Sequence, residues 1–188
     1  MADLFKGRYR VQSARCPKWD YRSNGAYFIT ICTKGRIHFF GGISSGLMHL
    51  SGAGEIVNNQ WQLIPDHFPH IELDAFCLMP NHFHGILIIH DDSLKVSRIT
   101  SEISTKIDIE FFSSISPKSG SLSTVIRSFK SSCTREINLQ DPLIHFKWQP
   151  RFYDVIIRDD ESYKRIRKYI NNNPRKWKRD LFYRESNS

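Results

Sequence analysis

The chain has 188 residues, of which 40% are hydrophobic, so it is long enough for one well-packed core and rather short for two. Its formal net charge of +8 is more often seen in proteins that meet phosphate backbones or anionic surfaces than in enzymes of small metabolites. The four cysteines are widely spaced without a Cys-x-x-Cys pair, which indicates neither a zinc ribbon nor a disulfide framework and favours a reducing compartment.

The N-terminal residues lack the apolar segment of a signal peptide. No apolar run reaches the roughly 18 residues that span a membrane. We therefore expect a soluble, cytoplasmic protein without a membrane partner.

The first third of the chain predicts a strand, a hairpin and a helix. Residues 26–34 are rich in β-branched and aromatic types and predict a strand, and the glycines within 41–46 predict a short hairpin after it. Apolar residues at helical spacing predict a helix over 51–64, closed by Pro65.

Two further strands are predicted as the arms of a β-hairpin. Residues 71–79 alternate apolar and acidic side chains, which places Leu73, Ala75 and Cys77 on one face. Pro80 and Asn81 are residue types that favour turns, and they lead into the second arm.

The second half begins with a segment of different character. Residues 91–120 are rich in Ser and Thr without a clean period and predict a flexible insertion. Helical spacing resumes over 121–137, and 148–157 predicts another strand. Acidic residues from Asp159 onward suit a helix N-terminus, and Pro174 ends that helix.

This order predicts an α+β fold of the ferredoxin-like kind. We expect a four-stranded antiparallel sheet with helices on one face, plus a C-terminal helix that carries candidate catalytic residues. We expect one domain over 1–188, with the insertion at 91–120 and a basic tail at 175–188.

The most informative motif is His82-Phe83-His84. Side chains alternate along a strand, so the two imidazoles share a face and Phe83 points the other way. The two imidazoles could therefore bind one metal ion, although two such histidines are more often ordinary structural residues.

The last predicted helix offers a second half of a site. Tyr163, Ile166 and Ile170 form an apolar stripe, and Tyr169 and Asn173 lie one turn apart on its flank. If that flank faces the histidine strand, two imidazoles, an amide oxygen and a phenol converge. Otherwise Asn173 is a helix cap beside proline.

A phenol with a pKa of about 10 is a poor nucleophile at neutral pH. It needs help in losing its proton or an electrophile polarised by a metal, such as a phosphate bound to a divalent cation. The product would be a phosphotyrosine link to a nucleic-acid strand, which conserves the energy of the phosphodiester and permits rejoining.

Basic and aromatic residues in the second half of the chain are candidates for contacts with DNA. For some, the solvated face of a helix or packing in the core is an equally good explanation. The candidates are Arg127, Lys130, Trp148, Tyr153, Arg158, Arg165, Lys168, Arg175 and Lys176.

The chain resembles the REP-associated tyrosine transposases, which belong to the single-tyrosine HUH transposases of insertion sequences. The resemblance runs over 27–177 without the insertion and rests on four motifs in the same order, Pro80-Asn81-His82-Phe83-His84, Trp148-Gln149-x-x-Phe152-Tyr153-Asp154, Ile157-Arg158-Asp159 and Tyr169-Ile170-x-x-Asn173-Pro174.

The resemblance implies an enzyme that nicks and rejoins single-stranded DNA at hairpin repeats in DNA transposition. It implies that His82 and His84 are catalytic metal ligands and that Asn173 is the third ligand. It also implies that Tyr169 is the nucleophile, forming a 5′-phosphotyrosine, with Mg²⁺ or Mn²⁺ as cofactor and a monomer or homodimer as the assembly. Because imidazoles suit manganese better than magnesium, Mn²⁺ is the ion to test first.

Two other functions remain open. One is a non-catalytic nucleic-acid-binding module on the same fold. The other is a nucleotide hydrolase with a longer alternating His motif, which is weakened because the next residue on that face is Ile86.

Overall fold

The protein is described by a computed structural model over residues 24–90 and 120–183. A four-stranded antiparallel sheet forms its centre, in the order β4-β5-β1-β6. Its strands are β1 (Gly25–Cys32), β4 (Ile71–Met79), β5 (His82–Ile89) and β6 (Tyr153–Ile157).

Smaller elements surround the sheet. A separate hairpin joins β2 (Gly41–Ser44) and β3 (Leu47–Leu50). The helical segments are η1 (Lys34–Arg36), α1 (Gly52–Gln62), α2 (Ile64–His67), α4 (Leu122–Gln140), α5 (Asp160–Asn172) and η3 (Pro174–Arg179). The chain order and the order of strands in the sheet confirm the predicted ferredoxin-like α+β fold. In the described part of the chain, no helix has the length and apolar character needed to cross a membrane.

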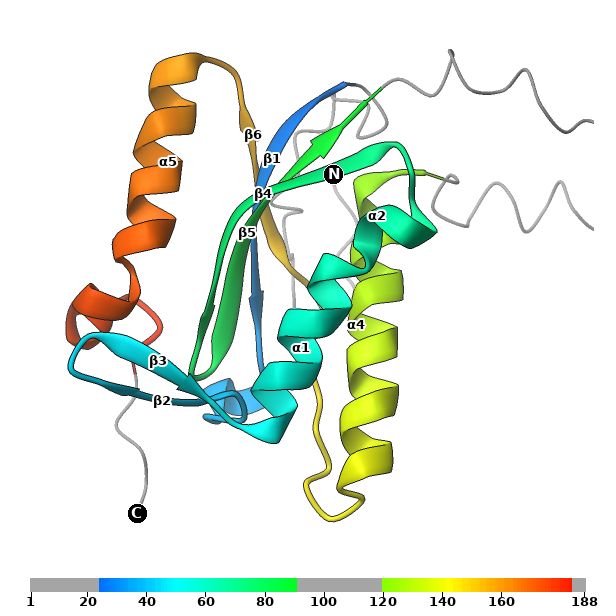
Figure 1. The fold of residues 1–188 in the computed structure, drawn as a ribbon, viewed down its shortest axis with the longest axis vertical. Helices are drawn as coiled ribbons and strands as arrows, with labels where there is room; N and C mark the ends of the chain where they lie inside the picture. Colours follow the sequence, from blue (N-terminus) through cyan, green and yellow to red (C-terminus); the bar gives the residue numbers. More distant parts are fainter. Residues whose placement is uncertain (1–23, 91–119, 184–188) are drawn as a thin grey trace, which may run out of the picture.

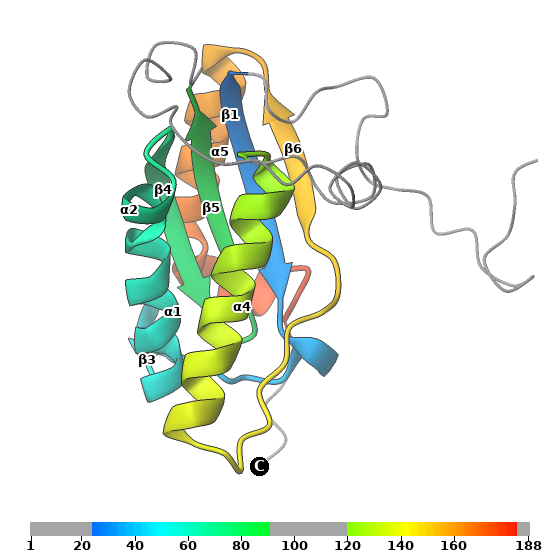
Figure 2. The same cartoon turned by 90° about the vertical axis from the view of Figure 1, so that its right-hand side faces the viewer.

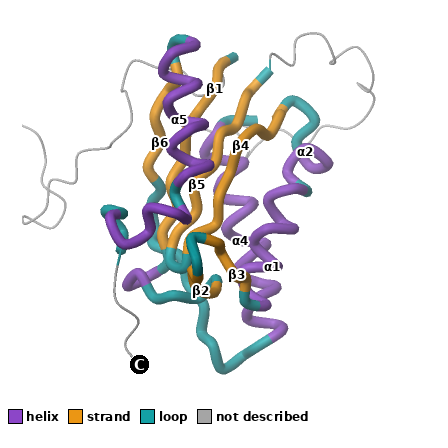
Figure 3. The backbone as a smooth tube through the Cα atoms, turned by 60° about the vertical axis from the view of Figure 1, so that its left-hand side comes forward, coloured by secondary structure: helices purple, strands orange, loops and turns teal. Residues whose placement is uncertain are grey.

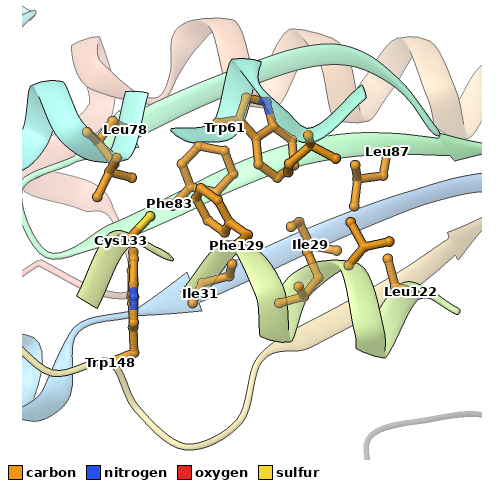
Figure 4. Packing of buried hydrophobic residues seen from close by; sticks show 14 of the residues in the cluster. Ile29, Ile31, Trp61, Leu78, Phe83, Leu87, Leu122, Phe129, Cys133 and Trp148 are labelled. Atoms are coloured by element: carbon orange, nitrogen blue, oxygen red, sulfur yellow. The ribbon is translucent and has the colours of Figure 1, made fainter. Parts of the chain in front are cut away.

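Helices α1 and α4 cover one face of the sheet, and α5 covers the other (Figure 1; Figure 2). The larger core lies on the side of α1 and α4 (Figure 4). There the ring of Trp61 packs 4.5 Å from that of Phe83 and 5.4 Å from that of Phe129. Phe83 thus faces this core, as the alternation along β5 predicts.

On the opposite face, α5 runs along the sheet and packs on it through a small apolar cluster (Figure 3). Ile170 is fully buried against Ile86 and Ile157 of the sheet, and Tyr163 and Ile166 pack beside them. These contacts confirm the predicted apolar stripe of the helix. The helix begins at Asp159, whose carboxylate accepts the N–H of Ser162 at 2.7 Å.

The structure corrects the predicted alternation of β4. Its register against β5 shifts between Leu73 and Phe76, both of which pack against the larger core. Ala75 and Cys77 instead pack on the α5 side. The prediction that Leu73, Ala75 and Cys77 share one face is therefore wrong, because a β-bulge adds one residue that alternation alone does not reveal.

Two predicted boundaries also differ. The strand expected over 148–157 begins only at Tyr153, and upstream of it a single bridge joins Trp148 to Thr33. Helix α1 ends before Pro65, as expected, but Pro65 then lies in the first turn of the short helix α2, a position that suits proline.

The predicted insertion and the predicted basic tail lie partly outside the described residues. Of the predicted insertion at 91–120, only Gly120 is described. Of the predicted basic tail, residues 175–183 are described, and they begin inside η3.

Gly85 of β5 gives a test of how tightly the sheet packs under α1. A Cβ at Gly85 would lie 2.7 Å from Cζ2 of Trp61 and 2.8 Å from Cε1 of Phe83. We expect Gly85→Ala to lower the free energy of unfolding by about 1–3 kcal/mol, because buried aromatic rings must shift to admit the methyl group. Urea unfolding followed by circular dichroism measures the change.

Gly42→Ala is the matched control, because a Cβ there meets nothing within 4 Å. We expect it to change the free energy of unfolding by less than about 0.5 kcal/mol. Equal losses in the two variants would contradict the packing described for β5.

Candidate active site

His82 and His84 lie on the face of β5 that α5 covers. His82 is fully buried and His84 is 1% exposed. Their ring centroids are 4.6 Å apart. The alternation of the strand therefore places both imidazoles on one face, opposite Phe83, as the sequence predicts.

Asn81 fixes the orientation and the tautomer of His82. The Nδ2 group of Asn81 donates to the carbonyl oxygens of Arg36 (3.2 Å) and Phe182 (2.9 Å), and its Oδ1 lies 2.8 Å from Nδ1 of His82. Because an amide oxygen only accepts, we assign the proton of His82 to Nδ1. Nε2 then carries a free lone pair.

The imidazole of His82 is suited to binding a metal ion. Burial, with the nearby His84 and Arg36, lowers the pKa of His82 to about 2, so the ring is neutral. Its buried Nε2 has no hydrogen-bond partner among the described residues. A neutral histidine with one nitrogen held by a hydrogen bond and the other unpaired is the usual form of a metal ligand.

His84 is held in a similar way and faces α5. Its Nδ1 lies 2.8 Å from Oγ1 of Thr30, the residue paired with it on β1. The ring of Phe28 stacks on the imidazole, with centroids 5.3 Å apart. Burial lowers the pKa of His84 to about 3. Its Nε2 lies 3.2 Å from the hydroxyl of Tyr169.

A carboxylate joins the two imidazoles from the segment after η3. The side chain of Asp180 is 3% exposed, and its Oδ1 lies 4.0 Å from Nε2 of His82. The same oxygen accepts the N–H of Phe182 at 2.6 Å. One ligand atom from each of His82, His84 and Asp180 lies within 4.8 Å of the others, so this group could hold a metal ion.

Asn173, the predicted third ligand, caps the C-terminal end of α5 and is 2% exposed. Within the described residues, neither atom of its side-chain amide meets the geometry of a hydrogen bond, although the amide lies close enough to the Tyr169 hydroxyl to lower the pKa of the phenol. A buried amide that is poorly satisfied costs free energy, which a ligand could recover. The structure therefore offers two candidates for a third ligand, the Asn173 amide and the Asp180 carboxylate.

Tyr169 brings a phenol to this cluster. Tyr169 is 43% exposed, so part of its side chain is open to solution. Burial of the hydroxyl, followed by the negative charge of Asp180, raises the pKa of Tyr169 to about 12. The phenol is therefore protonated at neutral pH.

The bulge in β4 helps to hold α5 in place. Asp74, at the bulge, accepts the hydroxyl proton of Tyr163 at 2.6 Å and forms an ion pair with Arg167 at 3.0 Å. Tyr163 lies six residues before Tyr169, on the same helix. The position of the Tyr169 hydroxyl thus depends on a polar anchor at one end of α5 and on buried Ile170 at the other.

The residues after α5 close over the histidines. The ring centroid of Phe182 lies 4.8 Å from that of His82, and the guanidinium of Arg36 lies 4.8 Å above Phe182. Trp177 is buried, with its ring 6.0 Å from His82. This apolar cover keeps the imidazoles out of water and accounts for their lowered pKa values.

The predicted DNA-contacting residues divide into two groups. Lys130 is half-buried and donates to the carbonyl oxygens of Gln149 (2.7 Å) and Pro150 (3.2 Å). Trp148 is 7% exposed and packs 5.1 Å from Phe146, so its face is not open to a base. The others are exposed: Arg127, Tyr153, Arg158, Arg165, Lys168, Arg175 and Lys176.

Comparison with known proteins shows what the chain as a whole is similar to. The chain is 34% identical over 180 residues to an uncharacterized protein of Haemophilus influenzae, covering 94% of this chain and 95% of that protein. It belongs to the same family as that protein. Among solved structures it is similar to a REP-associated tyrosine transposase bound to a REP hairpin, with a TM-score of 0.55 and 19% identity.

The chain is transposase-like in its fold. The match covers 86% of this chain and 73% of the solved transposase chain. No protein-family model matches the chain. The transposase-like fold confirms the predicted architecture, while the roles of individual residues stay predictions.

Asp180 and Thr30 are the site residues that sequence reasoning missed. Asp180 stands alone as an acid after the basic run 175–179, and that isolation is the one signal of it in the sequence. Thr30 lies in a strand of β-branched residues and carries no signal. Its role depends on the pairing of β1 with β5, which the sequence does not specify residue by residue.

The contact between Asn81 and His82 can be tested through metal binding. We expect Asn81→Ala to raise the dissociation constant for Mn²⁺ by roughly 10- to 100-fold, because the imidazole loses the partner that fixes its tautomer. Isothermal titration measures the constant. Asn138→Ala is the control, since Asn138 makes three hydrogen bonds on α4, away from the histidines. Similar loss in both variants would contradict the assignment.

A second pair of variants distinguishes the two candidate third ligands. We expect Asp180→Asn to weaken Mn²⁺ binding by at least about tenfold, since even partners outside the ligand shell have that effect. The amide still accepts the N–H of Phe182, so the local fold is kept. If Asn173→Ala weakens binding and Asp180→Asn does not, Asn173 is the third ligand.

Proposed function

We propose that this protein is a metal-dependent enzyme that nicks and rejoins single-stranded DNA at hairpin repeats, with Tyr169 as its nucleophile. The observation that carries the proposal is the 3.2 Å contact between the Tyr169 hydroxyl and Nε2 of His84, beside His82 and Asp180. A phenol next to a candidate metal group is the arrangement that phosphoryl transfer to tyrosine requires.

The proposed reaction exchanges one phosphoester bond for another. The phenolic oxygen of Tyr169 forms a bond to a backbone phosphorus, and the bond from that phosphorus to the 3′-oxygen breaks. The phenol loses its proton and the 3′-oxygen gains one, which leaves a 5′-phosphotyrosine and a free 3′-hydroxyl. Because the number of phosphoester bonds is unchanged, a 3′-hydroxyl can reverse the step and rejoin a strand.

The donor set fits a divalent cation. His82 and His84, with Asp180 or Asn173, would hold Mg²⁺ or Mn²⁺, and the mixed nitrogen and oxygen ligands favour Mn²⁺. A bound cation would supply polarisation of a phosphate oxygen and offset the charge that develops there.

The chain itself contributes position and access. Hydrogen bonds to Asn81 and Thr30 hold the two imidazoles, and the anchored helix α5 holds the phenol against them. Since the Tyr169 side chain is 43% exposed, a phosphate can approach it from solution. The raised pKa of Tyr169 means that its proton must be removed during the attack, not before it.

Hairpin DNA is the substrate class we propose. The solved transposase to which the chain is similar is bound to a REP hairpin. Exposed cations on α5 and η3, including Arg165, Lys168 and Arg175, lie on the elements that carry or follow Tyr169 and would contact the DNA backbone.

Covalent trapping tests the role of Tyr169. Hairpin DNA with a single-stranded extension is labelled at its 3′ end and incubated with Mn²⁺ and the protein, then run on a denaturing gel. We expect labelled DNA to migrate with the wild-type protein and not with Tyr169→Phe, because the 5′-phosphotyrosine retains the 3′ fragment. With a 5′ label, we expect a free fragment ending in a 3′-hydroxyl.

Tyr183→Phe is the matched control, because it removes the hydroxyl of another tyrosine and keeps the ring that packs 5.2 Å from that of Trp177. It should still form the adduct. Equal adduct from wild type and Tyr169→Phe would remove Tyr169 from this role. Hairpin binding without an adduct or cleavage by any of the proteins would assign the chain to the alternative, a non-catalytic nucleic-acid-binding module.

A further inference from the structure

The β2–β3 hairpin lies beside η3, near the end of α5 (Figure 1). Residues of these two segments line a basic pocket. We call it the η3 pocket. It has a volume of about 530 Å³. Its lining residues are Ile43, Ser45 and Gly46 of the β2–β3 hairpin and the whole of η3.

The pocket is strongly positive. Arg175, Lys176, Lys178 and Arg179 are exposed, and no acidic residue is among the lining residues. Within the described part of the chain, none of the four cations forms an ion pair. The next acid along the chain, Asp180, points instead toward His82 and the N–H of Phe182. The charge of the pocket is thus left for a ligand.

The hairpin turn shapes one wall of the pocket. Ser45 and Gly46 have φ values of 52° and 75°, the left-handed conformation of a tight two-residue hairpin turn. A Cβ on Gly46 would lie 3.3 Å from Cγ of Arg175. The turn therefore packs directly on the stem of Arg175, which also lines the pocket.

Trp177 forms the wall that the pocket shares with the candidate active site. Its buried ring packs 6.0 Å from His82 and 5.6 Å from His38, while the residues on either side of it face the pocket. Pro174, at one end of the pocket, directly follows Asn173. A strand that reaches Tyr169 thus has this pocket as its neighbour.

We propose that the η3 pocket binds a backbone phosphate of the same DNA strand that presents its scissile phosphate to Tyr169. This inference rests on the proposed function. Arginine and lysine side chains bind phosphate oxygens, and their contacts fix the position of a strand without reading its sequence. The pocket would therefore set the register of the strand at Tyr169, independently of the recognised sequence.

Phosphate neutralisation tests the proposal without any cleavage. Hairpin DNAs are prepared with one uncharged methylphosphonate at each position around the nick site, and their affinities are measured in EDTA by fluorescence anisotropy. Each DNA is titrated with wild type and with Lys176→Gln/Lys178→Gln. All the substituted residues are exposed, and unfolding curves check that the fold is kept.

We expect one or two adjacent positions at which the methylphosphonate lowers the affinity of the wild type for the DNA at least threefold. At these positions it should leave the affinity of the double variant unchanged. With unmodified DNA, the double variant should lower the slope of log affinity against log salt by about 1–2. Lys147→Gln/Lys164→Gln removes the same charge elsewhere and should keep the position-specific effect seen with wild type.

A uniform penalty at every phosphate in both proteins would overturn the pocket assignment. The outcome is independent of the trapping experiment. If the adduct forms but no methylphosphonate effect depends on Lys176 and Lys178, only the pocket assignment is rejected. If such an effect is seen but no adduct forms, only the role of Tyr169 is rejected. Failure of the wild type to bind hairpin DNA would overturn both.

Discussion

The structure depends on β5 being buried on both of its faces. Phe83 packs under α1 and α4, while His82, His84 and Ile86 face α5. A slip of one residue in the pairing of β5 would turn the histidines into the larger core and expose Phe83 to the polar side. The register that satisfies the core is therefore the register that builds the site, so the imidazoles are fixed by packing before any ligand is present.

Hydrogen bonds fix more finely the positions that packing gives to the two imidazoles. Each imidazole uses Nδ1 for a hydrogen bond inside the protein, to Asn81 or to Thr30. Nε2 of His84 then faces Tyr169, and Nε2 of His82 faces Asp180. Burial in the sheet and under Phe182 makes both rings neutral. The bulge at Asp74 then ties α5 to β4, which holds the Tyr169 hydroxyl against Nε2 of His84.

The sequence was informative where a single element carries the pattern. Alternation placed His82 and His84 on one face, and helical spacing placed Tyr169 one turn from Asn173. Prediction from the sequence failed where a feature depends on contacts between two elements. The bulge between Leu73 and Phe76 is a mismatch between strands, invisible in the alternation of one strand. Asp180 meets His82 only because the chain turns back after η3, a long-range contact that no local spacing encodes.

The segment after α5 also shows how much positive charge can lie beside the candidate metal-binding group of His82, His84 and Asp180. On its inner side lie the buried ring of Trp177, the partly buried ring of Phe182 and one carboxylate, that of Asp180. Outward, it gives the four cations of the η3 pocket. With neutral imidazoles and one carboxylate, a bound divalent cation would retain one net positive charge, which matches a single phosphate at Tyr169. In the proposed function the outward cations would extend that attraction to the next phosphates, so the same short segment would serve the reacting phosphate and its neighbours.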